Sequence, residues 1–492
     1  MIAATFVGYL ESDDTFYFRS AAGWVAGAPY LGLDHWGLRH AIVLPMALGF
    51  RLFGQSEATL LLPSLGYAAS LLVLIGVMAN HLAGWRAAVI AIAVTGVTPI
   101  FVTGASLVTT DLPEALFVIG SLWAWHRARE TLRPSLMVVS GLAAGCAFIT
   151  RETTVALIAF YGLVFVAERG RGLVAAMLMA GGFLLVAGSD WLYLYVMSDD
   201  PLYRIHIAMA GAQNDGPHLE QASETQAAID RFGALVMPRL ARPFGAVFLN
   251  QNFGLLLWAA VPATAYLVIR AVGEVRRAAA MLLGFFATWF FVCGYILAKW
   301  LWVIPRYYAV GLVLIIPLAV WLTGLMQRRP ARAWAMCSLI AGSGLLLTAA
   351  STIGAFAGER GLVKVVQAYP GTIYTDPATA LGASWLLARE GLDTRVSTDM
   401  PDPGALFYFD SRPRRPFPAN WPLRTVPAGW MLIETTTHST KWTGPLTLLP
   451  GVKDLLPADL RAKLNPAPLV TSLYRVPDLP INEQGAPVSA LR

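Results

Sequence analysis

The chain has 492 residues, of which 56% are hydrophobic and only 13% are charged. About a quarter of the residues in soluble proteins are charged, so this composition excludes an ordinary soluble protein and favours one that crosses a membrane many times. The net charge of +6 needs no nucleic-acid partner, because much of the excess lies in short loops between apolar blocks. Cys146, Cys293 and Cys337 each lie within such a block, which favours buried free thiols.

The apolar opening, residues 1–10, is far shorter than the ~20 residues of a membrane-spanning helix. It also lacks the basic flank and cleavage site of a secretory signal peptide. We therefore expect the annotated start, Met1, to lie inside a longer gene that encodes the whole first helix.

Asp13 and Asp14 follow this opening and are our first candidate catalytic residues. Ionisable groups at membrane depth are costly and are functional candidates by default. The alternative is a solvated helix end or a cap, but a cap needs only one such residue.

Further along the chain, apolar blocks long enough to cross a membrane alternate with short loops. Basic residues fall in every second loop, which the positive-inside rule assigns to the cytoplasm. The other loops then face outward, and together they suggest one outward-facing cavity. The blocks are residues 58–80, 87–104, 112–126, 135–150, 153–167, 172–197, 253–270, 278–298, 308–326 and 333–354.

The outward-facing side collects most of the unusual polar residues. Two long loops are expected there, at 11–57 and 198–252, and the first contains short interfacial helices at about 20–29 and 41–53. Headgroup contact or interfacial anchoring is the alternative for most of these side chains. The candidate binding residues on this side are Tyr17, His35, Arg39, His40, Arg151, Glu152, Lys299, Arg306 and Tyr307, with Asp111 as a third candidate catalytic carboxylate or, equally, a helix cap.

After residue 355 proline becomes frequent, charge returns and no further crossing segment follows. We expect a helix at 377–390, with Asp376 as its N-cap and Pro377 in its first turn. The fold prediction is a polytopic α-helical membrane module at 1–354, with about 10–11 transmembrane helices, and a soluble α/β domain at 355–492. The expected strands are 372–375, 395–397, 405–409, 430–434 and 469–476.

An outward cavity that combines carboxylates and guanidinium groups beside lipid suits a ligand that is part lipid and part anion. Arginine binds phosphate through a rigid fork of donors, so Arg151 and Arg306 are candidates to hold a lipid phosphate. A carboxylate could act as general base toward a hydroxyl. The sequence identifies no certain cofactor, and Asp13 and Asp14 could share a divalent cation.

The motif Asp13-Asp14-x-x-Tyr17, at the head of a long outer loop, resembles the acidic signature of the GT-C glycosyltransferases. It is most similar to the bacterial branch that includes aminoarabinose transferase and the protein mannosyltransferase-like enzymes. The order of Asp111, Arg151-Glu152 and Pro305-Arg306-Tyr307, followed by an outer α/β domain, extends this resemblance over most of the chain.

The resemblance implies transfer of a sugar, with inversion, from a polyprenyl-phosphate donor to a hydroxyl of a lipid such as lipid A, a glycan or a protein. It implies a multi-pass protein of the bacterial inner membrane, with the active site and the C-terminal domain facing the periplasm. Asp13 matches the base, Asp14 its partner and Asp111 a second cavity carboxylate. The aminoarabinose enzymes carry Lys-Pro-Pro where this chain has Leu38-Arg39-His40, which leaves the sugar open.

Two alternatives remain at this point. A transporter or flippase for a lipid-linked or anionic solute would place polar residues near the bilayer midplane on broken helices, and it often carries an internal repeat. We find no repeat, and the middles of the apolar blocks are nearly free of charge. An O-antigen-type ligase would need a different outer loop.

Overall fold

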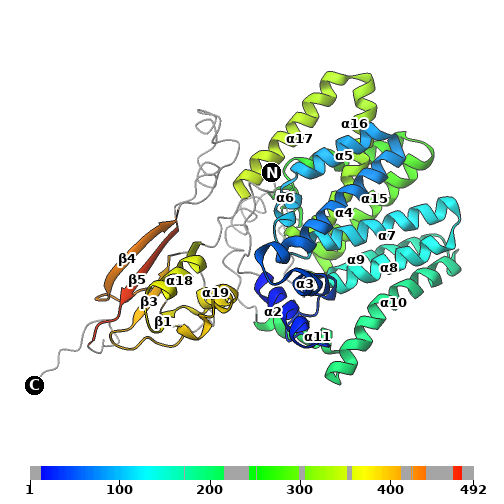
Figure 1. The fold of residues 1–492 in the computed structure, drawn as a ribbon. Coiled ribbons are helices and arrows are strands. Elements are labelled where there is room, and N and C mark those ends of the chain that lie inside the picture. The colour runs from blue at the N-terminus through cyan, green and yellow to red at the C-terminus, as the bar shows by residue number, and fades with distance from the viewer. Residues whose placement is uncertain are drawn as a thin grey trace, which may run out of the picture. The chain divides into compact units, whose positions relative to one another are not determined.

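Apolar helices make up most of the described chain, and they fall where the apolar blocks predict them (Figure 1). The computed structural model describes residues 13–170, 172–214, 243–245, 247–250, 252–297, 305–351, 357–411, 423, 425–438 and 469–478. The chain divides into two compact units. The first comprises Met1–Phe6 and Phe16–Ser351, and the second comprises Val7–Thr15 and Thr352–Arg492.

Each of the ten predicted blocks coincides with helix in the first unit. Two helices precede them, α2 (Asp13–Ala26) and α3 (His40–Phe53), so α2 begins about seven residues before the predicted interfacial helix. The elements that follow are α4 (Glu57–Ala83), α5 (Trp85–Val97), α6 (Pro99–Ala105), α7 (Asp111–Thr131), α8 (Pro134–Thr150), η1 (Glu152–Thr154), α9 (Val155–Ala167), α10 (Leu173–Ser198), α11 (Tyr203–Asn214), α14 (Leu256–Arg270), α15 (Gly273–Phe291), η2 (Val292–Ile296), η4 (Pro305–Leu314), α16 (Ile315–Arg328) and α17 (Pro330–Ser351).

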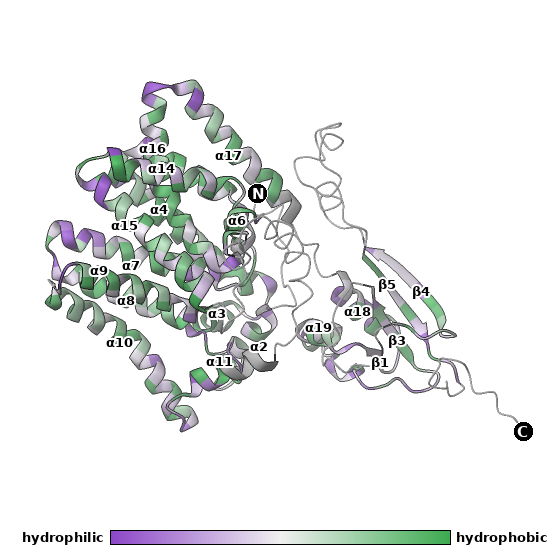
Figure 2. Cartoon of the chain, turned by 180° about the vertical axis from the view of Figure 1, so that it is seen from behind, coloured by the Kyte–Doolittle hydropathy of each residue, from purple (hydrophilic) through white to green (hydrophobic). Residues whose placement is uncertain are grey.

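Among the described residues, five helices are long and apolar enough to cross a membrane. The pair α5 and α6 makes a sixth if it counts as one bent span, and four shorter apolar helices accompany them. Figure 2 shows apolar residues along these helices and hydrophilic residues gathered at helix ends. The chain is therefore a multi-pass membrane protein, and the predicted fold class is confirmed.

The block 87–104 is not one straight span, since α5 and α6 meet at an angle of 70°. Thr98 between them has extended backbone angles (φ −74°, ψ 127°). Proline disfavours helical geometry in the residue before it, so Pro99 ends α5 and becomes the first residue of α6. The block predicted at 87–104 is therefore helical but broken, and Pro99 is the sequence signal for the break.

Helix α8 lies between α7 and α10 and packs closely on both (Figure 1). Glycines bring the backbones of α8 and α10 together: a Cβ at Gly141 would collide with the carbonyl of Met179, and one at Gly182 with the carbonyl of Val138. Small residues permit this close approach of helices in membranes. The contact fixes α10 against the helix whose end carries Arg151.

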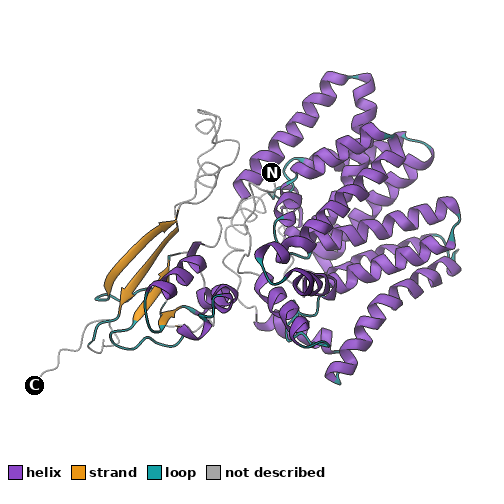
Figure 3. Ribbon diagram, in the orientation of Figure 1, coloured by secondary structure: helices purple, strands orange, loops and turns teal. Residues whose placement is uncertain are grey.

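The second unit contains all the described strands (Figure 3). Its sheet has the order β2-β1-β3-β5-β4, with β1 parallel to β2 and β3, and β5 antiparallel to β3 and β4. Each of the five predicted strands is present, as is the Asp376 cap, whose Oδ1 accepts the Thr379 N–H at 2.9 Å. The elements are α18 (Ala357–Ala368), β1 (Ile373–Thr375), α19 (Pro377–Arg389), β2 (Val396–Ser397), β3 (Leu406–Asp410), β4 (Met431–His438) and β5 (Leu469–Arg475).

The core of this second unit forms where α18 and α19 pack with the sheet. It contains Leu362 and Val366 of α18, Leu387 of α19 and Leu473 of β5. The predicted small α/β fold is thus confirmed. The three cysteines are free thiols as predicted, although Cys146 and Cys337 are only half-buried.

Candidate active site

Three charged side chains are buried together where α7 begins and α8 ends. Nη2 of Arg151 donates to Oδ1 of Asp111 at 2.7 Å, and its Nη1 donates to Oε2 of Glu114 at 3.0 Å. The three side chains are at most 5% exposed. Arg151 follows the last residue of α8 in an extended conformation (φ −160°, ψ 140°), so the chain leaves the helix at the residue that reaches α7.

The Glu114 carboxylate also receives two hydroxyl groups from η1. Thr153 Oγ1 donates to its Oε1 at 2.5 Å, and Thr154 Oγ1 donates at 3.3 Å. A buried ion pair is favourable only when its remaining hydrogen-bonding positions are also filled. These hydroxyls fill further acceptor positions on Glu114, so Arg151, Asp111, Glu114, Thr153 and Thr154 form one buried network that joins α7, α8 and η1. The Nε atom of Arg151 has no hydrogen-bond partner among the described residues.

The η4 segment covers this network from a distant part of the sequence. The Arg151 guanidinium lies 4.4 Å from the centre of the Tyr307 ring, and the Tyr307 carbonyl accepts a hydrogen bond from Trp289 Nε1 at 3.1 Å. Arg306 is half-buried beside Tyr307. The structure therefore brings together three sequence-predicted residues, Asp111, Arg151 and Tyr307.

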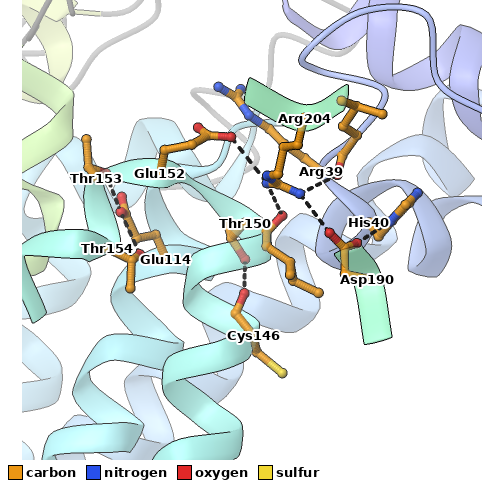
Figure 4. A network of polar contacts seen from close by, with 12 residues as sticks. Arg39, His40, Glu114, Cys146, Thr150, Glu152, Thr153, Thr154, Asp190 and Arg204 are labelled. Atoms are coloured by element: carbon orange, nitrogen blue, oxygen red, sulfur yellow. Dashed lines mark hydrogen bonds and ion pairs between the residues drawn. The ribbon is translucent and has the colours of Figure 1, made fainter. Parts of the chain in front are cut away.

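A second network surrounds Arg204 on α11 (Figure 4). Its Nη2 donates to Glu152 Oε1 at 3.2 Å and its Nη1 to Asp190 Oδ2 at 3.0 Å. The backbone carbonyls of Leu38 and Ile149 accept further bonds, at 3.1 and 3.2 Å. This one guanidinium thus joins the segment before α3, the end of α8, η1 and α10.

His40 and Arg39 bring the first outer loop into the same region. His40 Nδ1 lies 2.5 Å from Asp190 Oδ1, on the other side of that carboxylate from Arg204 (Figure 4). Arg39 Nη1 donates to the Tyr17 hydroxyl at 2.5 Å. Four more sequence-predicted residues, Tyr17, Arg39, His40 and Glu152, therefore take part in polar contacts at this end of the unit.

Glu152 differs from the other carboxylates of these networks because its side chain is 33% exposed. It lies in η1, which joins α8 and α9 outside both helices. Partial burial raises the pKa of Glu152, but the charges of Arg204 and Arg39, with smaller contributions that include His35, outweigh this effect and hold the pKa below its usual range. Glu152 is therefore a partly exposed carboxylate with a lowered pKa. His35 itself stacks on Trp36, with 3.7 Å between ring centres.

The described residues do not test whether Lys299, Asp13 and Asp14 join these networks. Lys299 lies outside the described residues, as does the side chain of Asp13, the first residue of α2. Asp14 Oδ1 accepts the N–H of Thr15 at 3.1 Å, and residues 7–15 group with the second unit. A shared pocket for Asp13, Asp14 and the networks stays a prediction.

Glu114, Asp190 and Arg204 are functional candidates that the site prediction missed. Glu114 lies three residues after Asp111 and hence on the same face of α7. Asp190 is an acid inside an apolar block, which was itself a signal. Arg204 lies on α11, in a loop expected to carry several charged residues, and nothing in its sequence context distinguishes it from them.

Comparisons with known proteins bear on this arrangement. A model of the dolichyl-phosphate-mannose-protein mannosyltransferase family matches residues 41–192. The match confirms the resemblance to the GT-C glycosyltransferases. The matched segment contains most residues of the two buried networks. Arg204, Tyr307 and the network residues before position 41 lie outside it. The match supports a glycosyltransferase activity.

Solved structures and curated proteins were compared as well. The chain is similar to two crystal structures of ArnT from Cupriavidus metallidurans, one in the apo state and one bound to undecaprenyl phosphate. Each is 17% identical, with 80% of this chain and 71% of that chain covered and a TM-score of 0.49. The search of curated proteins found no match.

Proposed function

We propose that this protein is an inverting membrane glycosyltransferase that moves a sugar from a polyprenyl-phosphate donor to an acceptor hydroxyl on the periplasmic side of a bacterial inner membrane. The observation that carries the proposal is the pair of buried carboxylate–arginine networks at one end of the apolar helices, largely inside the segment that matches the mannosyltransferase family. The name of that family contains a sugar linked to a lipid phosphate, dolichyl-phosphate-mannose. This supports a polyprenyl-phosphate sugar as the donor.

The buried network around Arg151 is assigned to positioning. Both terminal nitrogens of Arg151 already donate to carboxylates, and neither Asp111 nor Glu114 is accessible to an acceptor. Arg151 was a candidate for the donor phosphate, but its contacts favour a role in holding α7, α8 and η1 in register. Precise placement of reacting groups is a large part of what enzymes supply.

Arg306 is the better candidate for the donor phosphate. It is half-buried at the start of η4, and its neighbour Tyr307 packs on Arg151. A guanidinium fork can bind two phosphate oxygens at once. The exposed edge of Glu152 is placed to accept a hydrogen bond from the sugar or the acceptor, while the base role stays with Asp13 and its partner Asp14, as the resemblance implies.

The transporter alternative fits the described residues less well. In the two networks the buried carboxylates lie within about three turns of one end of their helices: Glu114 is near the start of α7, and Asp190 is eight residues from the end of α10. A carrier would need its polar site near the bilayer midplane. Clustering at one end favours chemistry at a membrane surface.

The test is release of lipid phosphate. The purified full-length protein is incubated with polyprenyl-phosphate sugars of several kinds and with lipid, glycan and protein acceptors. We expect the Asp13→Asn variant to lower turnover by about 10²- to 10⁴-fold, the usual contribution of a general base. The control is Asp199→Asn, because Asp199 has φ 59° and asparagine tolerates this left-handed conformation. Full activity of Asp13→Asn would show that the assigned base is wrong.

A further inference from the structure

Two histidines and two glutamates from three helices face one another at the far end of α7. His81 lies in the last turn of α4, His126 and Glu130 lie one turn apart near the end of α7, and Glu274 is the second residue of α15. Helix α7 carries Glu114 in its first turn, so His126 and Glu130 lie roughly 18–24 Å away along the helix axis at 1.5 Å per residue. The cluster is therefore a separate site.

The donor atoms are spaced as ligands of one ion. One atom from each of His81, Glu130 and Glu274 lies within 4.8 Å of the other two. His126 Nε2 is 3.7 Å from Glu130 Oε1 and 3.6 Å from Glu274 Oε1. Both distances exceed the hydrogen-bond range, but they are close to the ~3.3 Å that separates two ligands around a tetrahedral ion with bonds of about 2.0–2.1 Å.

His126 provides an independent sign that a ligand belongs here. Its side chain is 6% exposed, and among the described residues its buried Nε2 has no hydrogen-bond partner. A buried polar atom without a partner is costly. The same nitrogen lies nearest the carboxylates of Glu130 and Glu274, where a cation would accept its lone pair.

The contacts of His81 conflict with one another. Its Nε2 lies 2.6 Å from Arg127 Nη1, which can only donate, and 2.5 Å from Glu274 Oε1, which accepts when ionised. One ring nitrogen holds either a proton or a lone pair, so it cannot satisfy both partners. A cation between His81 and Glu274 would bind a lone pair from each and remove the conflict.

Two arginines balance the glutamates in the absence of an ion. Arg277 Nη2 donates to Glu130 Oε1 at 2.9 Å, and Arg127 Nη1 lies 3.5 Å from Glu130 Oε2 and 3.7 Å from Glu274 Oε1. Their side chains are 64% and 29% exposed. Both can therefore turn toward water when a cation takes their place.

We propose that His81, His126, Glu130 and Glu274 form a binding site for a divalent transition-metal ion that ties α4, α7 and α15 together. Two imidazoles and two carboxylates suit Zn²⁺, whose structural sites are tetrahedral. Ca²⁺ and Mg²⁺ prefer all-oxygen sites. The role is independent of sugar transfer, since the site lies at the other end of α7.

The experiment titrates metal-free, full-length protein in detergent with Zn²⁺ and, separately, with Mg²⁺. Calorimetry gives the stoichiometry, and thermal unfolding gives the change in Tm. We expect one Zn²⁺ per chain and a Tm that rises with Zn²⁺ concentration, because an ion bound only by the folded state stabilises it. Mg²⁺ should produce neither effect.

Variants assign the binding to these side chains. His126→Gln and Glu274→Gln should weaken Zn²⁺ binding at least about tenfold and abolish the rise in Tm. The matched control is Glu168→Gln, because Glu168 is also paired with an arginine, Arg129, but lies outside the cluster. If His126→Gln does not fold, His81→Gln tests the same ligand type at a more exposed position. Absence of stoichiometric Zn²⁺ binding, or unchanged binding by the folded variants, would reduce the cluster to an ion-pair network.

Discussion

Helix α7 carries charged groups at both ends, and the two ends differ in how those charges are satisfied. At its start, Asp111 and Glu114 are buried, and their partners are Arg151 and two threonine hydroxyls. At its other end, the exposed Arg277 and the partly exposed Arg127 balance Glu130, while the buried Nε2 of His126 has no hydrogen-bond partner among the described residues. The first network has a buried counter-charge from the protein itself, whereas the second can be completed by an ion from solution.

The largest effect on stability is expected from breaking the buried network around Arg151. Arg151→Met leaves two carboxylates buried without their counter-charge, which should lower the free energy of unfolding by about 3–5 kcal/mol. Arg129→Met removes the exposed pair with Glu168 and should cost less than about 1 kcal/mol. Thermal unfolding of both variants checks the prediction, and equal losses would contradict the assignment of Arg151 to positioning.

A smaller effect should follow from removing one donor of that network. Thr153→Val keeps the side-chain shape but takes away the hydroxyl that bonds Glu114 Oε1, and a hydrogen bond to a charged group contributes about 1.5–3 kcal/mol. Thr95→Val is the control, because the Thr95 hydroxyl bonds a carbonyl of its own helix and its loss should cost less. A Thr153→Val protein as stable as the control would show that Glu114 does not depend on this bond.

The smallest change in stability is expected at Glu152, where activity should respond instead. The Glu152–Arg204 pair is partly exposed, so Glu152→Gln should cost no more than about 1 kcal/mol. If the exposed edge contacts substrate, kcat/KM should fall about 10- to 100-fold, the equivalent of one hydrogen bond to a charged group. Steady-state kinetics measure this, with Glu168→Gln as control. Unchanged kinetics would exclude the contact.

Much of the fold could be predicted because single segments carry the information. The apolar blocks predict the helices, and the short predicted strands with the Asp376 cap predict the second unit. The bend between α5 and α6 was missed although Pro99 marks it, because the block was judged by its apolar length rather than by its backbone chemistry.

The candidate site could be predicted only in part. Counting the apolar blocks between Asp111, Arg151 and Tyr307 predicts that all three lie on the same side of the membrane. The structure brings these residues together. Which group pairs with which depends on how helices rotate against one another. Arg151 therefore seemed available for phosphate until Glu114, hidden in an apolar block, proved to occupy it.

The most direct test of the account places the purified protein in vesicles with a polyprenyl-phosphate sugar and an acceptor extract. Cleavage of the sugar–phosphate bond and movement of the donor between leaflets are followed in the same sample. The account predicts that lipid phosphate is released as sugar appears on the acceptor, with transbilayer movement no faster than in empty vesicles. Rapid movement of an intact donor, with no cleavage, would contradict it.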